Sequence, residues 1–234
     1  MSKPEAVIFD MDGVLIDSEP IHYEIERKLF DRLDIVVDEG LHRSYLGASS
    51  RFMYADLKSR FDLQQTVCEL MDMDELFRCE YFKRLDKIIL NNGVINLLHE
   101  IKASGLKLAV ATSSSPEIVR ILLDKCGISA IFDTIVTTSD AGKSKPAPDV
   151  YLLAAKRIGV SPANCIVFED SPNGLSSAKS AGMYCIVIQS DHTIIQGLTN
   201  ADYLIRSFTE VTLGQLFKFF SFTQTMESED KKFI

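Results

Sequence analysis

Short apolar runs alternate along the chain with segments of helical periodicity. The runs that fit buried strands cover residues 6–9, 106–111, 134–137, 165–168 and 184–188. Between the first two runs, Val94, Leu97, Leu98 and Ile101 follow the i, i+3, i+4, i+7 spacing of a buried helix face. Strands that alternate with helices predict an α/β fold, a parallel sheet with helices on both faces.

Residues 18–90 break this alternation. They contain no strand pattern and several helical groupings, such as Leu57 with Phe61. We therefore predict a helical insertion between the first strand and the rest of the sheet. The mostly polar last residues predict a loose tail. The expected organisation is a core of residues 1–17 and 91–220, a helical cap of residues 18–90 and a tail of residues 221–234.

Two serines that precede prolines predict helix starts. Ser115 stands before Pro116, and Ser161 stands before Pro162. Serine is a preferred N-cap residue, and proline is favoured at the first helical position. Each pair is therefore expected to open a helix.

Composition narrows the class of protein and its partners. A chain of 234 residues with 46% hydrophobic and 25% charged residues is typical of a globular protein with a sizeable core. The formal net charge of −8 makes nucleic acid and anionic membranes unexpected partners. No apolar stretch approaches the roughly 20 residues that cross a bilayer, and the first residues lack a signal pattern. We expect a cytoplasmic protein; nothing in the sequence indicates its oligomeric state.

The cysteines predict no disulfide framework and no zinc site. They are odd in number, widely spaced and without a CxxC pair, at positions 68, 79, 126, 165 and 185. Buried free thiols are the expected state.

Polar residues follow four of the predicted strands. In chain order these are Asp10 and Asp12, Thr112 and Ser113, Lys145, and Glu169 and Asp170. Each group alone has an ordinary explanation, such as turn chemistry or a helix cap. Open parallel sheets, however, carry their ligand sites at the carboxyl ends of the strands. The four groups together therefore favour one shared site.

The acidic and basic members of this set match the needs of phosphoryl transfer. Asp10, Asp12 and Asp170 supply the hard oxygen ligands that Mg²⁺ prefers. Lys145 would hold a phosphate oxygen and, as a nearby cation, lower the pKa of Asp10. We therefore expect Mg²⁺ as the cofactor and a small phosphorylated metabolite as the ligand.

The remaining members fit the same chemistry. The Thr112 hydroxyl and the Ser113 backbone N–H would hold further phosphate oxygens. Attack by Asp10 would form an aspartyl-phosphate, and Asp12 would act first as acid and then as base.

Four segments resemble the motifs of the haloacid dehalogenase superfamily. They are FDMDGVLIDSEP at 9–20, AVATSSS at 109–115, GKSKPAPDVY at 142–151 and FEDSPNG at 168–174. Their order and spacing are similar to those of the branch that contains β-phosphoglucomutase and the sugar-phosphate phosphatases. The resemblance implies a Rossmann-like core with a helical cap inserted after the first motif.

The resemblance also implies a role for each matching residue. Asp10 is then the nucleophile, and Asp12 is the acid/base and a magnesium ligand through its backbone carbonyl. Thr112 and Lys145 hold phosphate, Asp170 binds magnesium, and Glu169 joins or supports the metal shell. His22 matches a histidine at the cap hinge and is the candidate substrate contact.

The resemblance leaves more than one activity open. Dehalogenases of this fold lack an acid/base at the position of Asp12, so dehalogenation is disfavoured. The Lys-Gly-x-x-Arg cap stretch of the mutase has only a partial counterpart, because Leu46 replaces the lysine and Arg51 comes one place late. We therefore expect a phosphatase, with a hexose-phosphate mutase as the alternative. A catalytically silent binding module is a third, less favoured hypothesis.

Overall fold

The computed structural model describes residues 3–45, 48–189 and 197–230 of the chain. Its central feature is a parallel sheet in the order β3-β2-β1-β4-β5-β6. The strands are β1 (Ala6–Phe9), β2 (Lys107–Thr112), β3 (Thr134–Thr137), β4 (Cys165–Glu169), β5 (Tyr184–Ile188) and β6 (Tyr203–Ile205). The predicted α/β class and its five strands are confirmed. The edge strand β6 was missed.

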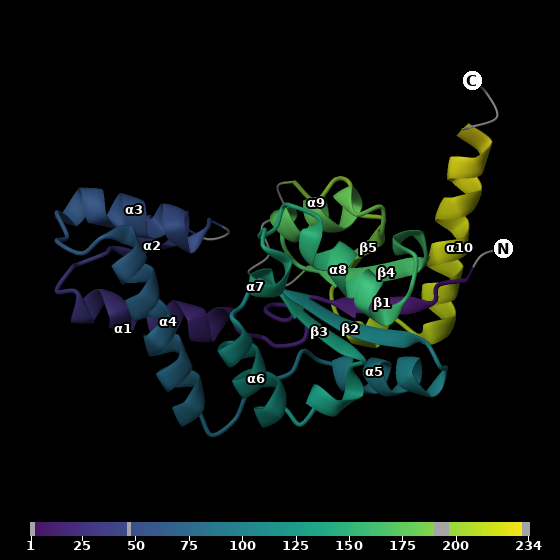
Figure 1. Ribbon diagram of the computed structural model, residues 1–234, viewed down its shortest axis with the longest axis horizontal. Coiled ribbons are helices and arrows are strands. Elements are labelled where there is room, and N and C mark those ends of the chain that lie inside the picture. Colours follow the sequence, from purple (N-terminus) through teal and green to yellow (C-terminus); the bar gives the residue numbers. More distant parts are fainter. Residues whose placement is uncertain (1–2, 46–47, 190–196, 231–234) are drawn as a thin grey trace. The chain divides into compact units, whose positions relative to one another are not determined.

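Helices cover both faces of the sheet (Figure 1). In this part of the chain they are α5 (Val94–Ala103), α6 (Pro116–Lys125), α7 (Thr138–Ala141), α8 (Asp149–Ile158), α9 (Pro172–Ser180) and α10 (Leu213–Asp230). The 3-10 turns are η1 (Ser129–Ile131), η2 (Pro162–Asn164) and η3 (Phe208–Glu210). α8 and α9 contact each other and the strands, while α5 contacts β2 and α10. The predicted apolar face of α5 is confirmed, since Val94, Leu97, Leu98 and Ile101 are all buried.

The central strand β1 is enclosed on both faces. Each of its residues is fully buried, as expected for a strand of a doubly covered parallel sheet. The Phe9 ring stacks on Phe168 of β4 with centroids 4.9 Å apart. The Asp10 backbone N–H then donates to the Phe168 carbonyl at 3.0 Å. Asp10 is thus held at the carboxyl end of the sheet by the packing of the strand that precedes it.

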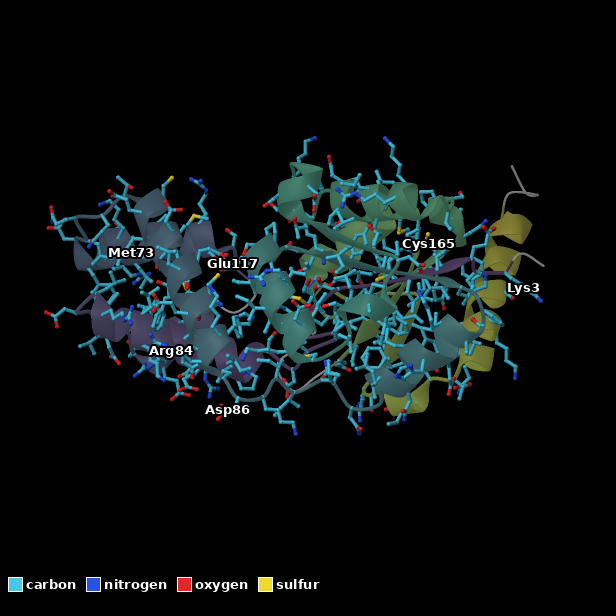
Figure 2. The ribbon with its side chains drawn as sticks, turned by 60° about the horizontal axis from the view of Figure 1, so that its bottom comes forward. Lys3, Met73, Arg84, Asp86, Glu117 and Cys165 are labelled. Carbon is cyan, nitrogen blue, oxygen red and sulfur yellow. The ribbon has the colours of Figure 1, made fainter. Side chains whose placement is uncertain are left out.

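The chain divides into two compact units. The core unit comprises Met1–Asp17 and Ile88–Ile234, and the helical unit comprises Ser18–Lys87. The helical unit contains α1 (Glu19–Arg32), α2 (Glu39–Ser44), α3 (Ser50–Phe61) and α4 (Val67–Arg84). Figure 2 labels Met73 and Arg84 along α4. The sequence pattern extended the insertion to residue 90, whereas Leu90 pairs with Ile16 inside the core unit.

The two serine–proline pairs behave differently. Ser115 caps α6, and its hydroxyl accepts a hydrogen bond from the Ile118 N–H at 3.4 Å, as predicted. Ser161 makes no side-chain cap, and Pro162 opens only the turn η2. The predicted helix start is found, but it opens a 3-10 helix of three residues, because β4 begins at Cys165, three residues after Pro162.

Residues 221–230 belong to a helix and not to a loose tail. α10 runs from Leu213 to Asp230, so the predicted tail is wrong over this range. Leu216 and Phe220 are buried, and the Phe220 ring packs against Tyr184 of β5 at 6.1 Å. These contacts hold the first turns of α10 against the core unit, and the helix continues from them to Asp230. Residues 231–234 lie outside the described residues.

The cysteines are free thiols, as predicted. Cys79, Cys165 and Cys185 are buried; Cys165 is labelled in the core unit in Figure 2. Cys126 is partly buried, and the expectation of burial is wrong for Cys68, which is exposed. Within residues 3–45, 48–189 and 197–230, no helix combines the length and apolar character that crossing a membrane requires.

Candidate active site

The ends of β1 and β4 bring three carboxylates together. The two strands are neighbours, with Phe9 opposite Phe168, so Asp10 follows one strand beside Glu169 and Asp170 of the other. One oxygen from each of the three carboxylates lies within 4.8 Å of the others. Residues separated by about two thirds of the chain thus share one site at the carboxyl edge of the sheet, as the strand-end argument expects.

Lys145 provides the positive charge of this cluster. It lies in the loop between α7 and α8, and its side chain is 5% exposed. Its Nζ atom lies 2.9 Å from Asp10 Oδ1 and 2.6 Å from Glu169 Oε1. One ammonium group therefore forms ion pairs with two carboxylates that reach it from different strands.

Burial and these ion pairs together determine the protonation of the cluster. Burial alone would lower the pKa of Lys145, but the carboxylates of Asp10 and Glu169 outweigh it and raise that pKa. Burial raises the pKa of Asp10 above its usual value, against the opposing effect of Lys145. Lys145 acts to lower the pKa of Asp10, as expected, but desolvation is the larger effect and the net shift is upward.

Glu169 behaves differently from Asp10. Its burial acts to raise its pKa, but Lys145 and neighbouring hydrogen-bond donors reverse this and lower the pKa. Glu169 therefore stays ionised as the counter-charge of Lys145, whereas Asp10 is the carboxylate whose charge the site disfavours. A second cation near Asp10 would favour its ionised form.

Glu169 is fully buried and surrounded by donors. Its Oε1 atom accepts from Lys145 Nζ at 2.6 Å and from the Tyr151 hydroxyl at 2.5 Å. Its Oε2 atom accepts from the Asp170 N–H at 3.0 Å, and from the Ser171 N–H and hydroxyl at 3.3 and 3.2 Å. A carboxylate offers about four lone-pair sites, so these donors occupy Glu169 fully.

Two glycines allow the backbone to approach the carboxylates. Gly13 has φ +70°, and a Cβ atom there would lie 1.8 Å from Asp170 Oδ2. A Cβ atom at Gly174, in the first turn of α9, would lie 1.8 Å from Glu169 Oε1. Only glycine fits at either position without displacing an acidic side chain.

Ser114, which was not among the predicted site residues, links the end of β2 to Asp12. The Ser114 hydroxyl donates to Asp12 Oδ2 at 2.6 Å, and the Ser114 N–H donates to Thr112 Oγ1 at 3.1 Å. Thr112 is buried at the strand end, whereas Ser113 is exposed. The signal that could have identified Ser114 was its place in the Thr-Ser-Ser-Ser run after the strand.

His22 lies in the helical unit and not in the core unit. Its Nδ1 atom is hydrogen-bonded to the Arg78 guanidinium. Arg78 also contacts Asp74 at 2.9 Å and Glu26 at 3.0 Å. His22 is thus part of a polar network within the helical unit. Leu46 of the partial cap motif lies outside the described residues, and Arg51 is exposed on α3.

The donor set of the core unit fits a hard divalent cation. Asp10 and Asp170 offer only oxygen atoms, and one oxygen of each lies within 4.8 Å of a Glu169 oxygen. Lys145 forms ion pairs with Asp10 and Glu169, so three carboxylates share a cluster with one ammonium group. Carboxylate oxygens are the ligands that Mg²⁺ prefers. The charge and the chemistry of the site therefore both favour such an ion.

Comparisons with known proteins identify the family of the chain. The family model described as haloacid dehalogenase-like hydrolase matches residues 4–182. The chain is 34% identical to a phosphorylated carbohydrates phosphatase of Thermotoga maritima, over 76% of this chain and 82% of that protein. It is 29% identical to a β-phosphoglucomutase of Bacillus subtilis, over 91% and 93% of the two chains.

A solved structure is similar over nearly the whole chain. It is CbbY from Rhodobacter sphaeroides in complex with xylulose 1,5-bisphosphate, with a TM-score of 0.78 and 30% sequence identity. The match covers 91% of this chain and 99% of that chain.

Proposed function

Because the chain belongs to the haloacid dehalogenase-like hydrolase family, we propose that it hydrolyses a small phosphomonoester, a sugar phosphate, with the help of Mg²⁺. The ester would transfer its phosphoryl group to Asp10 and release the sugar. The names of the relatives support this class of substrate, since one is a phosphatase of phosphorylated carbohydrates and another was solved with a sugar bisphosphate.

One observation supports the proposal most directly. Asp10 lies 2.9 Å from the Lys145 ammonium and shares a cluster of oxygens within 4.8 Å with Glu169 and Asp170. A carboxylate nucleophile needs a cation beside it to approach a phosphate dianion, and the cluster offers one ammonium group and a set of metal ligands.

The metal would be held by Asp10, Asp170 and the backbone carbonyl of Asp12. When bound, it neutralises part of the charge on the phosphoryl group and on the carboxylates. Glu169 would support this shell from behind, since its oxygens already accept hydrogen bonds from Lys145, Tyr151 and the backbone of the following residues.

The chain's own residues account for the two chemical steps. An Asp10 oxygen attacks phosphorus, the bond from phosphorus to the leaving oxygen breaks, and Asp12 donates a proton to that oxygen. Water then attacks the phosphorus of the aspartyl-phosphate and Asp12 takes the proton from the water. The bond between phosphorus and the Asp10 oxygen breaks, which restores the carboxylate and releases inorganic phosphate. Lys145 would hold a phosphate oxygen through both steps, with Thr112 and Ser113 at the remaining oxygens.

The Ser114 hydroxyl supports the role given to Asp12. Its hydrogen bond to Asp12 Oδ2 fixes one oxygen of the carboxylate that would exchange the proton. Ser114 would thus hold the acid/base in one orientation between the two steps.

Phosphate release from a panel of phosphorylated sugars, polyols and nucleotides tests this function. With Mg²⁺ present, we expect turnover that is highest on a sugar phosphate and that chelation abolishes. Asp10→Asn should abolish turnover without unfolding the chain, whereas Asp124→Asn, an exposed carboxylate on α6, should leave it unchanged. Turnover that survives complete removal of divalent metal would contradict the proposal.

A hexose-phosphate mutase is the second candidate, supported by the identity to β-phosphoglucomutase. It would use the same Asp10 chemistry but return the phosphoryl group to a sugar. Conversion of β-glucose 1-phosphate to glucose 6-phosphate with a bisphosphate activator would favour the mutase. Release of inorganic phosphate alone would favour the phosphatase.

A further inference from the structure

Tyr151 of α8 is a buried tyrosine whose hydroxyl points at the active site. Its ring lies in an apolar cluster that includes small residues, such as Ala154 of the same helix and Ala178 of α9. Phenylalanine would satisfy that packing equally well, so packing alone does not explain the hydroxyl. A buried phenol needs a hydrogen-bond partner, and here the partner is Glu169 Oε1 at 2.5 Å.

The same oxygen also accepts from Lys145, at 2.6 Å. The Lys145 Nζ atom in addition lies 4.9 Å from the centre of the Tyr151 ring. Tyr151 therefore touches both members of the Lys145–Glu169 ion pair, one with its hydroxyl and one with its ring face.

The two carboxylates compete for Lys145. Glu169 is fully buried and would draw the ammonium strongly if no other donor shared its charge. The Tyr151 hydroxyl takes part of that charge at Oε1. Lys145 is thereby left within 2.9 Å of Asp10, where a transferred phosphoryl group would be held.

We propose that Tyr151 is a positioning residue: by donating to Glu169 it keeps Lys145 directed at Asp10 and at the phosphoryl group. The inference rests on the proposed function, since it deepens the role of Lys145 as a phosphate holder. Tyr151 itself touches neither substrate nor metal in this role. It acts on phosphate only through Glu169 and Lys145.

The test uses Tyr151→Phe, which keeps the ring and removes only the donor. The probe is inorganic phosphate, titrated by calorimetry in the presence of Mg²⁺ and measured separately as an inhibitor of turnover. We expect phosphate to bind about tenfold more weakly and kcat/KM to fall by a similar factor, as for loss of one charge-assisted hydrogen bond. The affinity for Mg²⁺ alone should change by less than about twofold, because the hydroxyl acts on Lys145.

Two further variants separate positioning from packing. Tyr45→Phe removes a comparable hydroxyl–carboxylate bond, from Tyr45 to Asp56 at 2.6 Å in the helical unit, and calibrates the loss of stability. 4-Aminophenylalanine at position 151 keeps an N–H donor and should restore phosphate affinity to within about threefold of the wild type. If Tyr151→Phe does not fold, the 4-aminophenylalanine variant tests the proposal in its place.

The outcomes are distinct. The proposal is overturned if Tyr151→Phe binds phosphate as tightly as the wild type and only loses stability, as Tyr45→Phe does. It is also overturned if the 4-aminophenylalanine variant does not restore phosphate binding. A double variant with Glu169→Gln should lose no more phosphate affinity than Glu169→Gln alone; additive losses also overturn it. Absence of turnover on every phosphomonoester would contradict the proposed function, whereas the phosphate titration would still decide the role of Tyr151.

Discussion

Replacing Gly174 by alanine should destabilise the protein, although alanine is the better helix former. Gly174 lies in the first turn of α9, where alanine would be expected to gain up to about 1 kcal/mol. The new Cβ atom, however, would lie 1.8 Å from Glu169 Oε1 and 2.0 Å from Oε2. Since non-bonded carbon and oxygen atoms stay about 3 Å apart or more, the carboxylate must move by roughly 1 Å.

That movement acts on the central ion pair. Glu169 accepts from Lys145 at 2.6 Å and from Tyr151 at 2.5 Å. The side chain of Lys145 is 5% exposed and that of Glu169 is fully buried. Breaking a buried ion pair costs about 3–5 kcal/mol. After the gain in helix propensity, we expect a net loss of about 2–4 kcal/mol, a large part of the roughly 5–15 kcal/mol that stabilises a typical protein.

Urea unfolding followed by far-UV circular dichroism measures this loss, since the chain has no tryptophan to report it. The matched control is Gly214→Ala in the first turn of α10, where the nearest atom to a new Cβ is Thr212 Oγ1 at 4.0 Å. That control should gain up to about 1 kcal/mol. A Gly174→Ala variant that is as stable as the wild type, or gains like the control, would refute the reasoning.

Three further outcomes follow from the site. Asp10→Asn should raise the free energy of unfolding of the metal-free protein, by more at pH 8 than at pH 5. The raised pKa of Asp10 means that the folded state binds more protons than the unfolded state, so stability falls as pH rises; a gain independent of pH would contradict this. Gly13→Ala should weaken Mg²⁺ binding at least tenfold in calorimetry, because its Cβ would meet Asp170. Gly142→Ala should not weaken Mg²⁺ binding, because Gly142 has a similar φ of +83° but no atom within 4 Å of a new Cβ. Equal Mg²⁺ affinities in the two variants would count against the site. Ser114→Ala should lower kcat roughly tenfold in steady-state kinetics with little change in KM, since Asp12 loses the donor that orients it; an unchanged kcat would argue against that role.

The sheet was predictable because its strands are buried on both faces. Runs such as 6–9 and 184–188 are apolar without interruption, and this pattern can be recognised without any knowledge of long-range contacts. β6 was missed because it has three residues, two of which, Tyr203 and Leu204, are exposed. The end of the helical insertion depended on the pairing of Leu90 with Ile16, a contact that local periodicity does not encode.

The site was predictable to the level of strand ends and motifs. Asp10, Lys145 and the Glu169–Asp170 pair follow their strands in the order that the motifs suggest, and they lie together in the structure. Ser114 and Tyr151 were missed because their contacts span 102 and 18 residues and involve side-chain geometry. The effect of Lys145 on the Asp10 pKa was predicted, but the net upward shift was not, because it depends on the degree of burial, which the sequence pattern does not quantify.

The central claim is that the carboxylate of Asp10 accepts the phosphoryl group. Rapid acid quenching of the wild-type protein during turnover of a sugar phosphate with Mg²⁺, followed by peptide mass spectrometry, tests it most directly. We expect one phosphoryl group on the peptide that contains Asp10, stable in acid and removed by hydroxylamine. Phosphate released at the same rate with that peptide unmodified, or with the label on another residue, would contradict the account.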